Sequence, residues 1–294
     1  MSRTLLWIVG APRSGTSLLQ DLLSAQPELG WINQHLHASP EKLTLAGRNC
    51  RYDWPLLGDF WFERRYWKKK LPAPLEEPLF WEHLMPGFRY REAEPKLYDA
   101  ASLTEAEVAR AREGVDAVHA YVKREWLMGQ YCGPARVALL REVFPESKFI
   151  QLQRDPRSVA IHLASHLKQE SGKPFWEARA GWRALMPEAL QERLDRLPDT
   201  PLNFAGVMVR WWHYQYREEF TGLPAEDVLT LAYADLLGKT LPTVTRALKF
   251  LGFDPAPRLV RYLKFHALRE RNRRMNKDLP EAIAAQLEAA VQKL

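Results

Sequence analysis

The stretch that decides the fold is residues 4–26, TLLWIVGAPRSGTSLLQDLLSAQ. The apolar run from Leu5 to Val9 predicts a strand, and the leucines between Leu18 and Leu23 recur at helical spacing. Between them lies a turn that contains Gly10 and Gly15, which let the backbone bend tightly and approach a ligand closely. A strand, a tight turn and a helix in this order surround an oxyanion with backbone N–H groups. We therefore predict an anion site of the phosphate type.

This turn matches the phosphate-binding P-loop only in part. In the pattern G-x-x-x-x-G-K-[ST], Gly10, Gly15 and Ser17 hold their expected positions, but Thr16 replaces the lysine. The positive charge lies earlier in the turn, at Arg13. A P-loop kinase or nucleoside triphosphatase uses that lysine on the transferred phosphate, so this class is disfavoured. A turn that only joins two elements remains the other alternative.

The phrase P-R-S-G-T-S directly after a first strand resembles the 5′-phosphosulfate loop of the sulfotransferase family. These enzymes move a sulfuryl group from 3′-phosphoadenosine 5′-phosphosulfate (PAPS) to an acceptor hydroxyl or amine. The resemblance implies that Arg13, Ser14, Gly15, Thr16 and Ser17 bind the cofactor. Arg13 would also act in catalysis, because a preorganised cation stabilises charge that builds on the leaving nucleotide.

Residues 148–168, KFIQLQRDPRSVAIHLASHLK, predict a second turn of the same kind. A short strand from Phe149 to Leu152 is followed by Asp155 as helix N-cap and Pro156 at the first helical position. Arg154 lies at the end of this strand. In a parallel sheet, ligands gather at the carboxyl ends of the strands, so both turns are expected at one edge.

This second turn resembles the 3′-phosphate motif of the sulfotransferases, which begins R-[DN]-P and carries a serine eight residues after the arginine. The resemblance implies that Arg154 binds the 3′-phosphate. His162 stands at the serine position, and an imidazole can also donate a hydrogen bond to phosphate. Ser158, one turn earlier, is a further candidate.

Two later segments extend the nucleotide site. Residues 228–233, VLTLAY, predict another strand, and the following turn resembles the family's Y-E-D-L turn with Ala234 in place of the glutamate. The resemblance implies a nucleotide contact for Tyr233. The basic segment RERNRRMNK, residues 269–277, includes Arg273. In this fold such a segment can close over the 3′-phosphate, and a solvated helix end is the alternative.

The general base is the least determined residue. Some bacterial sulfotransferases carry a glutamate in a P-x-E-x-x-x-x-W phrase, which LPAPLEEPLFWEH (residues 71–83) resembles. The resemblance places Glu76 five residues before Trp81. We rank Glu76 first, His35 second and His83 third, since carboxylates and imidazoles are the usual bases. A surface carboxylate or a structural histidine is the alternative for each.

Between these motifs the sequence is less regular. Residues 30–100 are rich in aromatic residues and prolines, and we interpret them as an irregular, partly helical insertion on the acceptor side. The rings suit an acceptor pocket or lid, or they pack the insertion's own core. Periodic apolar positions predict a long helix over residues 103–128, a short one over 136–143 and a packing helix over 206–220.

Composition fits a globular protein of 294 residues with a net charge of +6. The two cysteines, Cys50 and Cys132, indicate neither a disulfide framework nor a metal site, and we predict no metal. We also expect no membrane span, no signal peptide, since cleavage would remove the first strand, and a cytoplasmic location.

Together these features predict one α/β domain over residues 1–294, with a P-loop-like, mostly parallel sheet flanked by helices. The predicted function is PAPS-dependent sulfuryl transfer to a small-molecule, carbohydrate or lipid acceptor, with 3′,5′-phosphoadenosine (PAP) as product. The alternatives are a P-loop kinase or nucleoside triphosphatase, and a basic protein that binds nucleic acid through residues 269–277. We expect no nucleic-acid partner, because that alternative leaves both turns unexplained.

Overall fold

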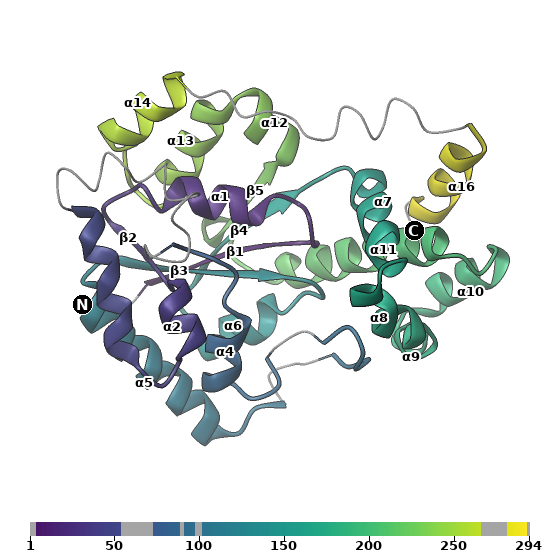
Figure 1. Ribbon diagram of the computed structural model, residues 1–294, viewed down its shortest axis with the longest axis horizontal. Coiled ribbons are helices and arrows are strands. Elements are labelled where there is room, and N and C mark those ends of the chain that lie inside the picture. Colours follow the sequence, from purple (N-terminus) through teal and green to yellow (C-terminus); the bar gives the residue numbers. More distant parts are fainter. Residues whose placement is uncertain (1–3, 54–72, 89–90, 98–101, 266–280, 293–294) are drawn as a thin grey trace.

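The centre of the molecule is a sheet of five parallel strands (Figure 1). The computed structural model describes residues 4–53, 73–88, 91–97, 102–265 and 281–292. The strands are β1 (Thr4–Gly10), β2 (Leu29–Trp31), β3 (Trp126–Cys132), β4 (Lys148–Gln153) and β5 (Val228–Ala232), in the spatial order β2-β3-β1-β4-β5. Every neighbouring pair is parallel, so all the carboxyl ends lie at one edge. The predicted parallel α/β fold is confirmed.

The alternation of β1 divides the core into two layers. Leu5, Trp7 and Val9 point into one apolar cluster, and Leu6 and Ile8 point into the other. The helices over the first cluster are α2 (Gln34–Ala38), α4 (Pro78–Leu84), α5 (Glu105–Val122) and α6 (Val137–Val143), with the 3-10 helix η1 (Leu43–Asp53). Those over the second are α1 (Thr16–Leu23), α12 (Tyr233–Gly238), α13 (Thr240–Phe250) and α14 (Pro257–Phe265).

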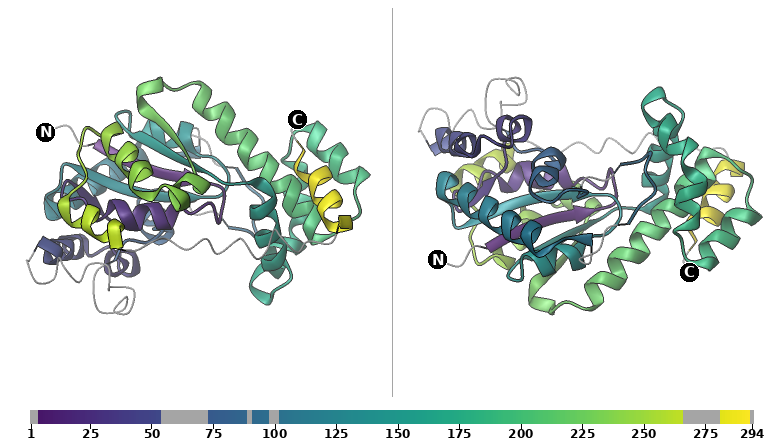
Figure 2. Two further views of the ribbon diagram at one scale, coloured as in Figure 1. Left: turned by 90° about the horizontal axis from the view of Figure 1, so that it is seen from above. Right: turned by 90° about the horizontal axis from the view of Figure 1, so that it is seen from below.

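Apart from the 3-10 helix η5 (Ala225–Asp227), which leads into β5, the remaining helices form a separate group, called here the helical lobe. It comprises α7 (Pro156–Leu167), η4 (Glu170–Gly172), α8 (Lys173–Glu177), α9 (Arg179–Ala184), α10 (Glu188–Arg196), α11 (Pro201–Thr221) and α16 (Glu281–Val291). Both views of Figure 2 show this lobe at one end of the molecule. Its core contains Trp182, Trp211 and Trp212, so the ring-rich helix predicted to serve packing does so.

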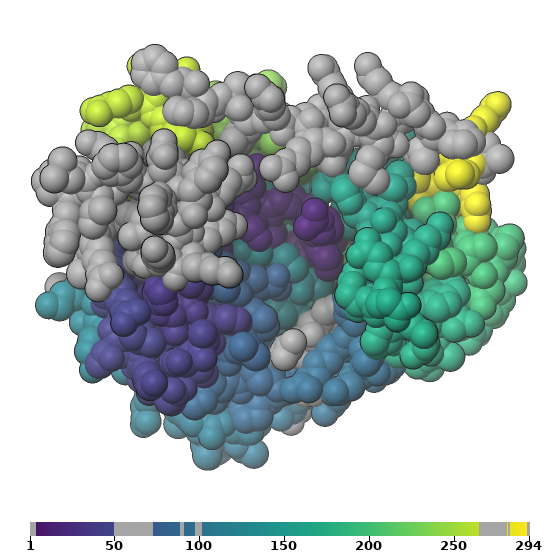
Figure 3. Space-filling view, viewed as in Figure 1, coloured from purple at the N-terminus to yellow at the C-terminus, as the bar shows by residue number. Residues whose placement is uncertain are grey.

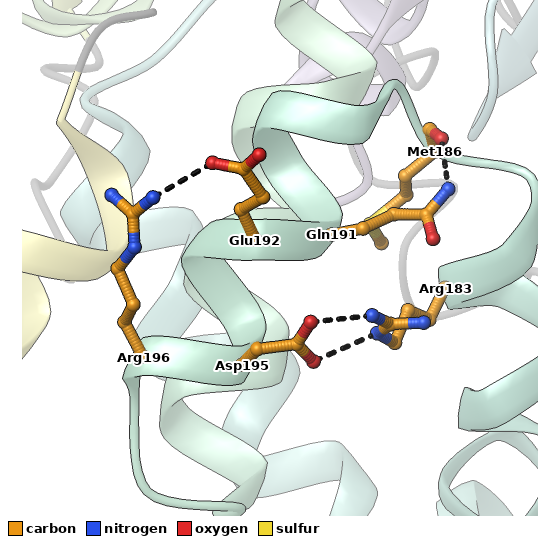
Figure 4. Close-up of polar contacts among 6 residues, drawn as sticks. All are labelled: Arg183, Met186, Gln191, Glu192, Asp195 and Arg196. Atoms are coloured by element: carbon orange, nitrogen blue, oxygen red, sulfur yellow. Dashed lines mark hydrogen bonds and ion pairs between the residues drawn. The ribbon is translucent and has the colours of Figure 1, made fainter.

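Two ion pairs lie on the outside of the helical lobe, one between helices α9 and α10 and one within α10 (Figure 4). Arg183 on α9 holds Asp195 on α10 through two hydrogen bonds of 3.1 and 2.6 Å, and Arg196 contacts Glu192 at 2.7 Å. Gln191 donates to the carbonyl oxygen of Met186 at 2.8 Å. Since these pairs are exposed, each stabilises the fold by only about 0–1 kcal/mol, and the apolar core contributes more.

The lobe is tied to the sheet through α11. The Tyr216 hydroxyl on α11 donates to the carbonyl oxygen of Gly10, at the end of β1, over 3.3 Å. Helix α7 packs along α11 and begins immediately after the β4 turn. The helical lobe therefore fixes the direction in which the chain leaves β4.

The helix predicted over residues 103–128 is wrong in its last part. Helix α5 ends at Val122, Lys123 adopts a left-handed conformation with φ 53°, and the chain enters β3 at Trp126. The charged residues 123–125, Lys-Arg-Glu, separate the helix from β3 and are not part of the helix, and β3 itself is buried along almost its whole length. This missing strand is the one that pairs with β1 on the side away from β4.

The region 30–100 is also less separate than predicted. Trp31 belongs to β2, and Phe80 and Trp81 are buried in the sheet's own core, with Trp81 and Trp7 ring centroids 4.6 Å apart. These rings therefore support packing rather than an acceptor pocket. The aromatic residues between 54 and 72 lie outside the described residues.

Candidate active site

The turn between β1 and α1 has the backbone of an anion loop. Arg13 and Gly15 both adopt positive φ values, 69° and 94°, and the Ser14 amide donates to the Ala11 carbonyl at 3.1 Å. These left-handed residues turn successive N–H groups towards one side, as a ligand-binding nest requires. Ser14 is fully buried, and its hydroxyl has no hydrogen-bond partner among the residues that the structure describes, so it is a donor that an anion in the loop could use.

The second predicted turn meets this loop directly. Arg154, at the end of β4, donates a hydrogen bond to the carbonyl oxygen of Arg13, and its guanidinium carbon lies 4.8 Å from the Tyr233 ring centroid. The Tyr233 ring also covers Gly15, where an added Cβ would lie 2.5 Å from it. The ends of β1, β4 and β5 therefore meet as one surface, because neighbouring parallel strands end at the same edge.

Helix α7 carries the two other candidates for the 3′-phosphate. Asp155 caps its first turn by accepting from the Arg157 amide, and Pro156 is the first helical residue, as predicted. Ser158 is buried and His162 half-buried. Because they are four residues apart on a helix, they share one face. Arg273 lies outside the described residues.

Glu76 reaches the site because β2 is short. Strand β2 stops at Trp31, which pairs with Met128, so on the side of β3 away from β1 no strand of the described residues continues beside Gln130 and Cys132. Glutamate side chains take its place. Glu77 Oε2 accepts from the Gln130 amide at 3.0 Å, and Glu76 Oε1 accepts from the Cys132 amide at 3.2 Å.

The two glutamates differ in their surroundings. Burial raises the pKa of Glu76 to about 6, partly offset by the Cys132 amide. Burial raises the pKa of Glu77 further, to about 8, against donors from Gln130, Gln20 and Trp81. Glu76 is half-exposed and ionised at neutral pH, whereas Glu77 is fully buried and its oxygens are occupied. Glu76 is therefore the carboxylate that can take a proton from a bound acceptor.

The two histidine candidates lie differently. His35 is half-buried on α2, and its amide donates to Asn33, which N-caps that helix. His83 is exposed on α4 and lines a 270 Å³ pocket together with Pro40, Glu41, Leu43, Leu84, Arg110, Glu113 and Gly114. No residue of the anion loop is among those lining residues. Glu76, the first-ranked candidate, accepts a hydrogen bond from Cys132 at the end of β3 beside the loop.

Sequence reasoning missed two side chains beside the anion loop. The Gln130 amide Nε2 donates to the Thr16 hydroxyl at 3.1 Å and to the Ser17 hydroxyl at 3.0 Å, and Cys132 Sγ lies 3.0 Å from Thr16 Oγ1. Both come from β3, a strand that was not predicted and whose first three residues were assigned to the end of a helix. Their spacing of two residues at a strand's carboxyl end is the signal that could have found them.

The site is open on one side. In the space-filling view, purple residues from the N-terminal part of the chain lie in a recess beside the teal helical lobe (Figure 3). Within the described ranges, no three His, Cys, Asp or Glu side chains are grouped to hold a metal ion. No helix in that part of the chain is long and apolar enough to cross a membrane.

The family model that matches this chain and three solved structures with a similar fold all carry the description of sulfotransferases. The model described as the sulfotransferase family matches residues 6–257. Sulfotransferase STF9 from Mycobacterium avium has a similar fold, with TM-score 0.57 and 15% identity, covering 100% of this chain and 78% of that one. Sulfotransferase STF1 from Mycobacterium tuberculosis H37Rv has a TM-score of 0.56 and 13% identity, and the match covers 100% of this chain and 78% of that one. The sulfotransferase domain from the curacin biosynthetic pathway has a TM-score of 0.52 and 13% identity, and the match covers 99% of this chain and 98% of that one. A search of curated proteins found no match.

Proposed function

The chain belongs to the sulfotransferase family, and from this premise we propose that it transfers the sulfuryl group of PAPS to a hydroxyl or amine of a small-molecule, carbohydrate or lipid acceptor, in the cytoplasm. The observation that carries the choice of donor is the contact of Arg154 with the Arg13 carbonyl. It unites an anion loop with a second cationic turn, as a nucleotide with phosphates at both ends of its ribose requires.

The loop holds the 5′-phosphosulfate in this proposal. Ser14, with its buried unpartnered hydroxyl, donates to the anion together with the loop amides and the Thr16 and Ser17 hydroxyls. Arg13 supplies the positive charge that a P-loop lysine would otherwise provide. Its guanidinium stabilises the charge that builds on the leaving phosphate oxygen as the sulfur–oxygen bond breaks.

The turn after β4 holds the other end of the nucleotide. Arg154 binds the 3′-phosphate, with Ser158 and His162 on the adjoining helix face. Arg154 is 9% exposed, so a charge-assisted hydrogen bond from it is poorly screened by solvent. The guanidinium lies over the Tyr233 ring, 4.8 Å from its centroid, where a cation–π contact helps to hold it in place. Arg273 remains a proposed contact from the basic segment.

Glu76 acts as the general base. The acceptor oxygen attacks sulfur, its proton passes to the Glu76 carboxylate, and PAP leaves with the bridging oxygen. A pKa of about 6 keeps this carboxylate ionised at neutral pH while making it a stronger base than an ordinary glutamate. His35 and His83 are the second and third choices for this role.

A thermal-shift panel tests the proposed donor against its rivals. PAP should raise the melting temperature in excess chelator more than ADP does, and more than ATP with Mg²⁺. Stabilisation by ATP with Mg²⁺ and not by PAP would favour a kinase or nucleoside triphosphatase. Stabilisation by oligonucleotides alone, lost steeply with salt, would favour a nucleic-acid binder.

A further inference from the structure

The end of β3 contributes a side-chain amide directly behind the anion loop. Gln130 is 1% exposed, and its Nε2 donates to two hydroxyl oxygens, Thr16 Oγ1 at 3.1 Å and Ser17 Oγ at 3.0 Å, with the sulfur of Cys132 farther away at 3.6 Å. Its main-chain amide is held by Glu77, so the side chain starts from a fixed point. The amide therefore contacts both residues that open α1.

The orientation of this amide follows from hydrogen-bond accounting. With Nε2 towards the hydroxyls, one buried group, the Gln130 Oε1 atom, has no partner. The reverse orientation would place the two N–H donors of the amide at the position of Oε1, which has no hydrogen-bond partner among the described residues. Two buried donors without acceptors cost more than one such acceptor. The N–H groups therefore face Thr16 and Ser17.

A hydroxyl that accepts from an amide has its own hydrogen left to donate elsewhere. Thr16 Oγ1 also lies 3.0 Å from Cys132 Sγ. Burial raises the pKa of the Cys132 thiol, so it stays protonated and can donate its hydrogen to Thr16 as well. When the thiol donates in this contact, both hydroxyls accept from β3 side chains, and each keeps its own O–H for a ligand in the loop.

We infer that Gln130 is a positioning residue for the sulfuryl donor: its amide turns the Thr16 and Ser17 hydroxyls so that both donate to the phosphosulfate. This inference rests on the proposed function, since it needs an anion in the loop. Gln130 itself touches no part of the donor. A residue that only filled space here would support the fold without coupling to those hydroxyls.

A double-mutant cycle on PAP binding separates these roles. Calorimetry is run on Gln130→Met in the wild-type loop and in a loop without hydroxyls, Thr16→Val with Ser17→Ala. In the wild-type loop, Gln130→Met should weaken PAP binding roughly tenfold, the scale of one charge-assisted hydrogen bond. In the loop without hydroxyls, the same substitution should change the PAP dissociation constant less than about twofold.

Gln20→Met is the matched control. Gln20 is an equally buried glutamine, but its amide donates to Glu77 and the Leu75 carbonyl rather than to the loop hydroxyls. Its substitution should weaken PAP binding equally in both loops. If Gln130→Met does not fold, the isosteric Gln130→Glu replaces it, and should lose more affinity in the wild-type loop than in the loop without hydroxyls.

The outcomes distinguish this inference from the proposal beneath it. If the Gln130 variants lose the same factor of PAP affinity in the two loops, the positioning role is overturned, and the sulfotransferase assignment is left intact. Failure of the wild-type protein to bind PAP at all would instead remove the proposed donor, and the inference with it.

Discussion

Arg154 at the end of β4 donates a hydrogen bond to the main-chain carbonyl of Arg13 in the β1 turn, across 141 positions of sequence. The contact fixes the distance between two cationic turns that the chain places far apart. Because β1 and β4 are adjacent parallel strands, the sheet itself brings the turns together. The predictions below follow from this pairing and from the carboxylates on the other side of β1.

Arg13→Ala should lose most of its turnover with PAPS while the fold is retained, since Arg13 is an exposed loop residue. The physical reason is that, in the proposed mechanism, the Arg13 guanidinium stabilises the charge that builds on the leaving phosphate oxygen. Transfer by the wild type should continue in excess EDTA, measured by release of PAP. Turnover that stops with EDTA and returns with Mg²⁺ would contradict this metal-independent account.

Glu76→Gln should lower kcat by roughly 10²–10⁴ while leaving the affinity for PAP nearly intact, because it removes the base and not the nucleotide site. His35→Ala and His83→Ala are compared side by side as the alternative bases. In the wild type, kcat/KM should rise with pH through about 6 as Glu76 ionises. Near wild-type kcat in all three variants would show that the base lies elsewhere.

Glu77 should make the protein less stable as the pH rises. Below pH 4.5 its carboxyl is protonated in both states; above that the unfolded chain releases the proton, while the folded chain keeps it up to about pH 8. Stability therefore falls across this window. Glu77→Gln removes that slope, so the unfolding free energy of the wild type minus that of the variant should decrease from pH 5 to 8 in urea titrations. A flat difference would mean that its three donors keep Glu77 ionised in the fold.

Gly15→Ala should abolish most PAP binding. Its added Cβ would lie 2.5 Å from the Tyr233 ring, at a φ of 94° that alanine rarely adopts. Gly252→Ala is the matched control, since Gly252 has a φ of 89° with nothing within 4 Å. Both variants should lose about 1–2 kcal/mol of stability from the left-handed backbone. Only the first should lose affinity in calorimetry, and equal PAP binding by the two would show that Tyr233 does not constrain the loop.

The features that the sequence could predict are those determined by residues close together in the chain. The β1 and β4 turns each carry their strand, their arginine and their helix start within about twenty residues. Capping of α7 by Asp155 and Pro156 depends on three consecutive positions and was predicted correctly. Glu76 was named from a resemblance; its carboxylate lies beside Cys132, and its role as the base stays a prediction.

The parts that sequence could not predict depend on neighbouring strands. Gln130 contacts Thr16 because β3 lies beside β1, and the order of strands in a sheet cannot be read from the sequence of one chain. Glu76 and Glu77 approach β3 because β2 stops at Trp31. The residue at which a strand ends depends on its pairing with neighbouring strands, which the local sequence does not show. Trp126 and its apolar neighbours fit a helix or a buried strand equally, so the pattern favoured the wrong element there.

The central claim is that the two turns form one site for a nucleotide with a 3′-phosphate. Calorimetric titration of the wild type and Arg154→Ala with PAP and AMP measures it most directly. A charge-assisted hydrogen bond of about 1.5–3 kcal/mol predicts that the wild type prefers PAP by roughly 10–100-fold. Arg154→Ala should lose most of that preference and bind AMP much as before. If the wild type binds AMP as tightly as PAP, the 3′-phosphate site does not exist and the assignment of PAPS as donor is wrong.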